Sequence, residues 1–130
     1  MDLGLKNKRV LITGASKGIG ASIANSFLKE GSKVTLVARD EKKLISLLSG
    51  FPKENDYISA DLRQASSPSK VAKEVVLRHK TIDIIIHNVG GALGIKNPFS
   101  PVKDWMEVWN FNLGIAIEIN NVIAPLMKKN

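Results

Sequence analysis

The sequence predicts an α/β protein built on a doubly wound parallel β-sheet that helices cover on both faces. Short apolar, β-branched segments alternate along the chain with segments whose apolar residues recur at helical spacing. The apolar segments are continuous rather than alternating, which indicates strands buried on both faces. Right-handed crossovers between such strands give the spatial order 3-2-1-4.

The first strand and helix lie in the segment RVLITGASKGIG, at residues 9–20. Gly14, Gly18 and Gly20 fall between an apolar run and a helical pattern. Glycine is needed where a tight turn or a close approach leaves no room for a Cβ atom. Such a unit turns backbone N–H groups and the positive end of a helix toward a phosphate. The apolar positions of this helix are Ile19, Ile23, Ala24, Phe27 and Leu28.

The remaining elements follow in alternation. Asp40 is expected to cap a short helix, and Ser67, followed by Pro68, is expected to cap the next helix. A loop containing glycine and proline spans about residues 89–101. Strands are predicted at residues 33–39, 57–62 and 81–88, and the longer helices at 69–80 and 103–127.

The composition is that of a soluble globular chain, with 44% hydrophobic and 24% charged residues. A length of 130 residues suffices for one domain but not for two, so residues 1–130 are expected to form a single domain. The N-terminus lacks the apolar segment of a signal peptide, and no apolar run is long enough to span a membrane. Together with the absence of cysteine, this favours a cytoplasmic protein without a membrane partner.

The net charge of +7 arises from 19 Lys and Arg residues against 12 Asp and Glu residues. The lysines are dispersed and are not interleaved with aromatic residues, and no nucleic-acid-binding module is present. We therefore expect no nucleic-acid partner. Most of this charge is expected to be solvated, with a minority serving phosphate groups of a small ligand.

The segment TGASKGIG, with the spacing G-x-x-x-G-x-G, closely resembles the cofactor motif of the short-chain dehydrogenase/reductase family. The resemblance covers nearly the whole chain but only the first half of the family's usual length. It implies a Rossmann-type fold that is truncated after the fourth strand and its following helix, with strand order 3-2-1-4. It also implies that the cofactor is held by Gly14, Ser16, Lys17, Gly18, Ile19 and Gly20.

The end of the second strand indicates which nicotinamide cofactor is bound. An acidic residue there accepts hydrogen bonds from a ribose 2′-OH, whereas a basic residue suits a 2′-phosphate. Ala38 stands where NAD-preferring family members typically carry the acid, and Arg39 and Lys17 can together hold a 2′-phosphate. We predict NADP as the cofactor, with NAD as the less favoured alternative.

Two further segments resemble motifs of the family. Asp61 and Leu62 resemble its adenine-contacting pair, and the segment HNVG that starts at His87 resembles its N-N-A-G motif. The resemblance implies that Asn88 holds the centre of the sheet and that Gly90 lets the cofactor approach the backbone. His87 is expected to be a hydrogen-bonded strand-end histidine rather than a catalyst.

The last predicted helix carries an amide side chain on an apolar stripe. An amide buried without a partner costs about 1–3 kcal/mol, so Asn112 needs one. Asn112 resembles the active-site asparagine of the family, which implies that it helps to position a water and a catalytic lysine. The alternative is a core asparagine bonded to neighbouring backbone, and the tryptophans are expected in the core or at an oligomer contact. The stripe comprises Trp105, Trp109, Asn112, Ala116, Ile119 and Ile123.

The family's catalytic serine and its Tyr-x-x-x-Lys signature do not occur in these 130 residues. In the family the tyrosine supplies a proton, the lysine lowers its pKa and the serine orients the substrate. The single tyrosine, Tyr57, is followed four residues later by Asp61. We therefore expect cofactor binding without hydride transfer by the family mechanism.

Two functions remain open on these grounds. One is the cofactor-binding half of an NAD(P)-dependent oxidoreductase that acts on a small carbonyl or alcohol. The other is a catalytically inert nucleotide-binding or interaction module. In either case Ile84–Ile86 would form an apolar sheet edge, and such edges pair with other chains. We expect a marginally stable chain, or a homo-oligomer.

Overall fold

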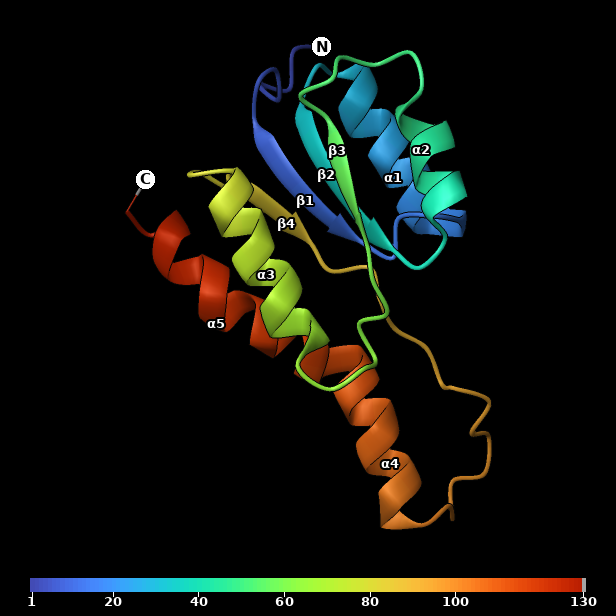
Figure 1. The fold of residues 1–130 in the computed structure, drawn as a ribbon. Helices are drawn as coiled ribbons and strands as arrows, with labels where there is room; N and C mark the ends of the chain where they lie inside the picture. Colours follow the sequence, from blue (N-terminus) through green and yellow to red (C-terminus); the bar gives the residue numbers. More distant parts are fainter. Residues whose placement is uncertain (130) are drawn as a thin grey trace.

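The structure is a computed structural model that describes residues 1–129. Within these residues it contains a four-stranded parallel sheet with the order β3-β2-β1-β4 (Figure 1). The predicted α/β class and strand order are therefore confirmed. The strands are β1 (Arg9–Thr13), β2 (Lys33–Ala38), β3 (Asp56–Ser59) and β4 (Ile84–Ile86).

Helices cover both faces of the sheet (Figure 1). Helices α1 (Gly18–Lys29) and α2 (Glu41–Leu48) lie on one face, and α3 (Ser67–Arg78) and α5 (Ile115–Met127) lie on the other. Successive side chains of a strand point to opposite faces, so Val10 packs with α1 while Leu11 packs with α3 and α5. The central strands are thus buried on both sides, as their apolar sequences predict.

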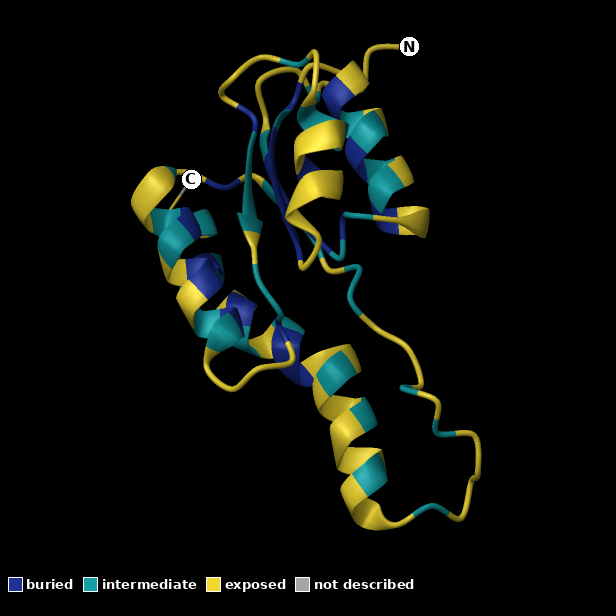
Figure 2. Cartoon of the chain, turned by 45° about the vertical axis from the view of Figure 1, so that its right-hand side comes forward, coloured by how far each residue is buried: buried dark blue, intermediate teal, exposed yellow. Residues whose placement is uncertain are grey.

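A helical arm extends away from this layered body. Helix α4 (Val102–Trp109) lies below the sheet in Figure 1, and the connection that follows β4 runs beside it. Within the described chain no residue of α4 is buried, and Figure 2 shows mostly exposed positions along it. Trp105 and Trp109 are 50% and 48% exposed, so of the two places expected for them the core is excluded, and an oligomer contact stays a prediction.

A π-helical segment accounts for this difference. The single helix expected at residues 103–127 is divided by η1 (Asn110–Gly114) between α4 and α5. The predicted apolar stripe assumed a continuous α-helix with about 3.6 residues per turn. A π turn holds more residues than an α turn, so residues of this stripe before and after η1 lie on different faces. Ile119 and Ile123 are consequently fully buried, while the tryptophans of the same extrapolated stripe remain half-exposed.

Several predicted element ends shift. Strands β3 and β4 are shorter than expected, and residues 60–62, predicted as the end of the third strand, lie beyond β3. Asp40 caps α2 as predicted, because its carboxylate accepts a hydrogen bond from Lys43 N at 3.2 Å. Ser67 is not the cap of α3, because the helix already begins there and Ser66 takes the preceding position with φ 68°.

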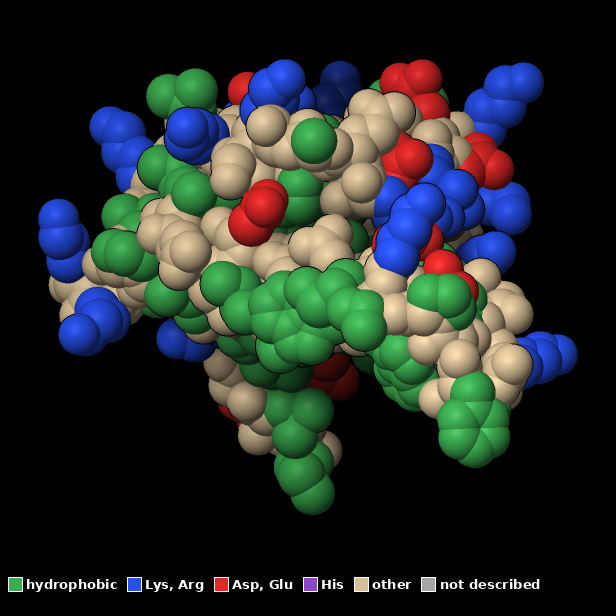
Figure 3. Space-filling model, turned by 90° about the horizontal axis from the view of Figure 1, so that it is seen from below, with side chains coloured by type: hydrophobic (Ala, Val, Ile, Leu, Met, Phe, Trp, Pro, Cys, Tyr) green, Lys and Arg blue, Asp and Glu red, His purple; other side chains and the backbone are tan. Residues whose placement is uncertain are grey.

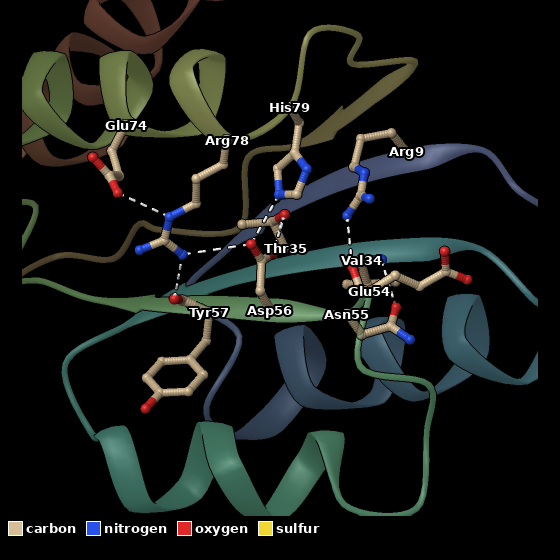
Figure 4. Close-up of polar contacts among 10 residues, drawn as sticks. All are labelled: Arg9, Val34, Thr35, Glu54, Asn55, Asp56, Tyr57, Glu74, Arg78 and His79. Atoms are coloured by element: carbon tan, nitrogen blue, oxygen red, sulfur yellow. Dashed lines mark hydrogen bonds and ion pairs between the residues drawn. The ribbon is translucent and has the colours of Figure 1, made fainter.

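The outer edge of β3 is held to the end of α3 by a polar network around Asp56 (Figure 4). Thr35 Oγ1 donates to Asp56 Oδ1 at 2.6 Å, and His79 Nε2 lies 2.8 Å from Asp56 Oδ2. Arg78 Nη1 lies 3.4 Å from Asp56 Oδ2 and donates to the carbonyl of Tyr57 at 3.0 Å. This network covers part of the edge strand with side chains.

The pKa of Arg78 is raised in this network. Burial by itself lowers the pKa, but the hydrogen bond and charge of Glu74, together with the charge of Asp56, outweigh that effect. Arg78 Nε lies 2.9 Å from Glu74 Oε1 (Figure 4). The raised pKa favours the charged guanidinium, which is the form that pairs with Asp56 and Glu74.

The opposite edge of the sheet is different. Within residues 1–129, strand β4 pairs only with β1, in the register Val10 to Ile84 and Ile12 to Ile86. The three isoleucines of β4 are only partly buried. The predicted apolar edge is therefore present, whereas the β3 edge carries a polar cover.

We expect Asp56→Ala to lower the free energy of unfolding by about 1–3 kcal/mol, because the fully buried Thr35 hydroxyl loses its acceptor. Urea unfolding followed by circular dichroism measures the loss. Thr35→Val should cost little when added to Asp56→Ala, since it removes the unpaired hydroxyl. Glu54→Ala, which removes an exposed ion pair with Lys33, is the matched control and should cost less than about 1 kcal/mol. Additive losses at positions 35 and 56 would contradict this coupling.

Candidate functional site

A cleft of about 490 Å³ opens at the carboxyl ends of the strands, within the size range of small-molecule sites. The connections that follow all four strands contribute to its lining. In doubly wound sheets ligands bind outside this end of the strands. Every residue predicted to bind cofactor lines the cleft except Gly20. These lining residues are Gly14, Ser16, Lys17, Gly18, Ile19, Arg39, Asp61, Leu62, Asn88 and Gly90.

The glycine-rich turn has backbone geometry that side chains disfavour. Gly14 and Gly18 have φ values of 63° and 57°, in the left-handed region. Gly20 lies beneath the turn, where a Cβ atom would overlap the carbonyl oxygen of Gly14 and lie 2.5 Å from Asn88 Nδ2. Gly20 therefore allows α1 to pack closely under the turn, and this explains why it does not line the cleft.

The N-terminus of α1 faces the cleft without a protein group to neutralise it. Lys17 occupies the cap position, makes no side-chain capping hydrogen bond, and no acidic residue lies in the first turn of this described helix. The first N–H groups of a helix lack intrahelical partners and carry the positive end of its dipole. Ile19, expected on the apolar face of α1, is 74% exposed and lines the cleft instead.

Three cationic side chains and one carboxylate line the cleft. Among residues 1–129, none of Lys17, Arg39 and Arg63 forms an ion pair. Asp61 Oδ1 accepts a hydrogen bond from the backbone N–H of Arg63 at 3.0 Å, so this carboxylate shapes the turn after β3. The lining therefore presents unpaired positive charge to an anionic ligand.

Asn88 ties the glycine-rich turn to the end of β4. Its Nδ2 donates to the carbonyl of Gly14 at 3.0 Å, and its backbone N–H donates to Thr13 Oγ1 at 3.2 Å. His87 points elsewhere, because its Nε2 lies 2.8 Å from Asn120 Oδ1 on α5. This contact supports the interpretation of His87 as a hydrogen-bonded strand-end histidine.

Asn112 is exposed and is not among the residues that line the cleft. Its Oδ1 accepts from Gly91 N at 2.9 Å, and its Nδ2 donates to Gly91 O at 2.7 Å and to Val108 O at 2.8 Å. A Cβ atom on Gly90 would lie 2.6 Å from Asn112 Oδ1. The side chain thus fixes the backbone after β4 against η1, which corresponds to the alternative of an asparagine bonded to backbone.

The cleft also contains residues that sequence reasoning did not identify. Ala60 directly precedes Asp61, and Val37 lies two residues before Arg39 at the end of β2, so their places near predicted site residues were the only signal for them. Leu93 lies in the long loop and Phe111 in η1, where no strand pattern points to the cleft. Arg63 follows the Asp61 and Leu62 pair directly, so its position was an available signal.

Tyr57 lies outside the cleft lining. Its hydroxyl donates to Glu41 Oε1 on α2 at 2.8 Å. That hydrogen bond raises the pKa of Tyr57, with smaller contributions from burial and from the charge of Glu41. A tyrosine that donates protons in catalysis needs a lowered pKa, so Tyr57 has neither the place nor the environment for that role.

The described residues form neither a metal-binding cluster nor a membrane-spanning helix. Residues 1–129 contain no cluster of three or more His, Asp or Glu side chains that could hold a metal ion. Over the same residues, none of the helices has the length and apolar character needed to cross a membrane.

The cleft and the glycine-rich turn at the carboxyl ends of a 3-2-1-4 parallel sheet define a protein of the Rossmann-type α/β class. Residues 8–130 match the short chain dehydrogenase family. The chain belongs to this family of oxidoreductases.

Solved structures of similar proteins share this fold. L-sorbose reductase from Gluconobacter frateurii, complexed with NADPH and L-sorbose, matches with a TM-score of 0.87 and 28% identity over 99% of this chain and 51% of that one. The Pseudomonas aeruginosa RhlG/NADP active-site complex matches with a TM-score of 0.81 and 27% identity, over 96% of this chain and 50% of that one.

A relative with higher sequence identity is the Dictyostelium discoideum dehydrogenase/reductase SDR family protein 7-like. It is 36% identical over 121 residues, which cover 83% of this chain and 38% of that protein. An uncharacterised oxidoreductase of Staphylococcus epidermidis is 27% identical over 96% of this chain and 54% of its own length. The chain therefore spans about half the length of these relatives, or less.

We expect Gly90→Ala to destabilise the chain by about 1–3 kcal/mol, because the added methyl meets Asn112 Oδ1. The same substitution in an Asn112→Ala background should cost clearly less, since the opposing oxygen is gone. Thermal and urea unfolding of the four proteins in this cycle provide the measurement. Equal costs in both backgrounds would show that Asn112 does not pack on Gly90.

Proposed function

We propose that this chain binds NADP(H) and serves as the cofactor-binding half of a short-chain oxidoreductase. The observation that carries the proposal is the cleft, whose lining combines the uncapped N-terminus of α1 with the unpaired cations Lys17 and Arg39. A dinucleotide with a 2′-phosphate carries negative charge at its pyrophosphate, which suits the helix N-terminus, and at its 2′-phosphate, which suits the two cations. Two solved relatives are complexes with NADPH and NADP.

The arrangement of the lining suggests a pose for the cofactor. The pyrophosphate would lie at the glycine-rich turn and accept hydrogen bonds from the first N–H groups of α1. Asp61 and Leu62 would contact the adenine, while Asn88 and Gly90 would border the nicotinamide end. Ser16 and Ile19, which also line the cleft, would contact the cofactor between these ends.

The end of β2 supports NADP over NAD. Ala38 offers no carboxylate to a ribose 2′-OH, and the neighbouring Arg39 presents a planar guanidinium that suits a phosphate. Lys17, across the glycine-rich turn, would add a point charge to the same phosphate. The hydrogen bond from Ser59 Oγ to the Arg39 carbonyl, at 3.0 Å, fixes the backbone from which this side chain projects.

The bound nicotinamide would supply hydride transfer to or from a small carbonyl or alcohol. The residues of this chain would bind and orient the cofactor, and Asn112 would hold the Gly90–Gly91 backbone along the nicotinamide end. We propose that a serine and a Tyr-x-x-x-Lys pair would have to come from a further part of the protein, because the environment of Tyr57 does not suit proton transfer.

An inert nucleotide-binding module remains the second candidate, and the environment of Tyr57 is the observation that favours it. The intact mass of the native protein separates the two. A mass near twice 14.2 kDa would support the oxidoreductase, and a mass of 14.2 kDa would support the inert module. A second test is whether purified residues 1–130 oxidise NADPH with a carbonyl substrate and lose that activity in Asn112→Ala. Such activity would contradict the inert module. It would also contradict our proposal that the catalytic serine, tyrosine and lysine come from a further part of the protein.

We also propose that copies of the chain associate through the outer face of α4. Exposed hydrophobic side chains gather at the end of the molecule where α4 lies (Figure 3). Helix α4 carries one lysine against Asp104 and Glu107, so two positively charged chains repel least there. A symmetric pair would bury the same stripe from both copies. The stripe comprises Val102, Trp105, Met106 and Trp109 of α4 and continues with Leu113 of η1 and Ile117 of α5. The cytoplasmic location stays a prediction.

We expect Arg39→Asp to weaken NADPH binding by about 10-fold to 100-fold and to change NADH binding far less, because only NADPH carries the 2′-phosphate. Titration calorimetry with each cofactor measures both constants. Lys42→Asp makes the same charge change on α2, outside the cleft lining, and serves as the control. Equal losses for the two cofactors would refute the assignment to NADP.

We expect the purified chain to sediment as a species larger than a monomer at micromolar concentration. Trp109→Glu should shift it toward the monomer, because a charge in the centre of the α4 stripe opposes burial. Leu77→Glu places the same charge on α3 at an 81% exposed position and should leave the mass unchanged. A monomeric wild-type chain would contradict the proposal.

A further inference from the structure

Arg63 and Phe111 form a contact inside the cleft that none of the roles above uses. The Cζ atom of Arg63 lies 5.7 Å from the centroid of the Phe111 ring, within the range of a cation–π interaction. Both residues line the cleft. They come from separate parts of the chain, since Arg63 follows β3 and Phe111 belongs to η1.

The guanidinium of Arg63 has no other partner among the described residues. Its backbone N–H bonds to Asp61, but its side chain takes part in no hydrogen bond or ion pair across residues 1–129. Phe111 is partly buried and packs against the core between the sheet, α3 and α5. The ring is therefore a fixed support for one side of an exposed guanidinium.

The position of Arg63 along the sheet indicates its ligand. The sheet order places the end of β2, with Arg39, between the glycine-rich turn after β1 and the end of β3. If the turn holds the pyrophosphate and Arg39 the ribose 2′-phosphate, the group that reaches the end of β3 is the purine. A guanidinium plane and a purine ring both stack on π surfaces.

We infer that Arg63 is a cofactor-binding residue that stacks on the purine ring, with its guanidinium between that ring and Phe111. This inference rests on the proposed binding of NADP(H). The stacked arrangement needs a planar cation, so a lysine cannot replace the arginine. Because Asn112 follows Phe111 directly, the stack also joins the adenosine end of the cleft to the segment that holds Gly91.

Calorimetric titrations with NADPH, adenosine 2′,5′-bisphosphate and adenosine 5′-monophosphate test the inference. The proteins are the wild-type chain, Arg63→Ala, Arg63→Lys, Phe111→Leu and, as a comparison at the neighbouring strand end, Arg39→Ala. Arg63 is exposed, so its variants should fold normally. Thermal unfolding checks the folding of Phe111→Leu, whose ring packs on the core.

We expect Arg63→Ala to weaken all three ligands by a similar factor of about tenfold, because each carries the purine. Arg63→Lys should bind nearly as weakly as Arg63→Ala. Phe111→Leu should weaken binding of all three ligands by a smaller factor than Arg63→Ala does. Arg39→Ala should weaken NADPH and the bisphosphate but spare the monophosphate. These two patterns distinguish a purine contact from a 2′-phosphate contact.

Four results would overturn the inference. Unchanged binding of adenosine 5′-monophosphate by Arg63→Ala would remove the purine contact. Wild-type affinity in Arg63→Lys would show that a positive charge is enough at this position. If Arg63→Ala weakened only the bisphosphate and NADPH, Arg63 would be assigned to the 2′-phosphate. Failure of the wild-type chain to bind any of the three ligands would overturn the proposed function as well, whereas the other results leave it intact.

Discussion

The structure depends on the close packing of α1 beneath the turn that follows β1. The carbonyl of Gly14 points at Gly20 and accepts a hydrogen bond from Asn88 Nδ2 at 3.0 Å, so one oxygen joins the turn, the helix and the end of β4. Any side chain at position 20 would separate them. The same contact sets the direction of α1, and with it the N–H groups that face the cleft.

A second junction places the backbone on the other side of the cleft. Asn112 bonds to both the N–H and the carbonyl of Gly91, and Gly90 leaves room for its oxygen. The π-helical geometry of η1 brings Asn112 and Phe111 to this side, while α4 continues outward. Two asparagines thus fix the two backbone segments that border the cleft, and the cationic side chains between them remain free for a ligand.

The two edges of the sheet and the helical arm show where the molecule leaves surface for other contacts. The β3 edge is covered by Arg78 and by the network around Asp56, whereas the outer edge of β4, with its half-buried isoleucines, has no strand partner within residues 1–129. Helix α4 presents a continuous apolar face to solvent. Apolar surface of this extent favours burial against another polypeptide.

The sequence by itself determined the strand order and the glycine-rich turn, because these depend on short-range patterns and on the handedness of crossovers. Together with the family resemblance, it also predicted ten of the seventeen residues that line the cleft. The tertiary structure decided what those patterns do not carry. The contacts of Asn112 with Gly91, of Arg63 with Phe111 and of His79 with Asp56 join residues that are far apart in the chain. Periodicity also could not predict the change of face at η1, because a single π turn interrupts the 3.6-residue repeat and has no repeat of its own.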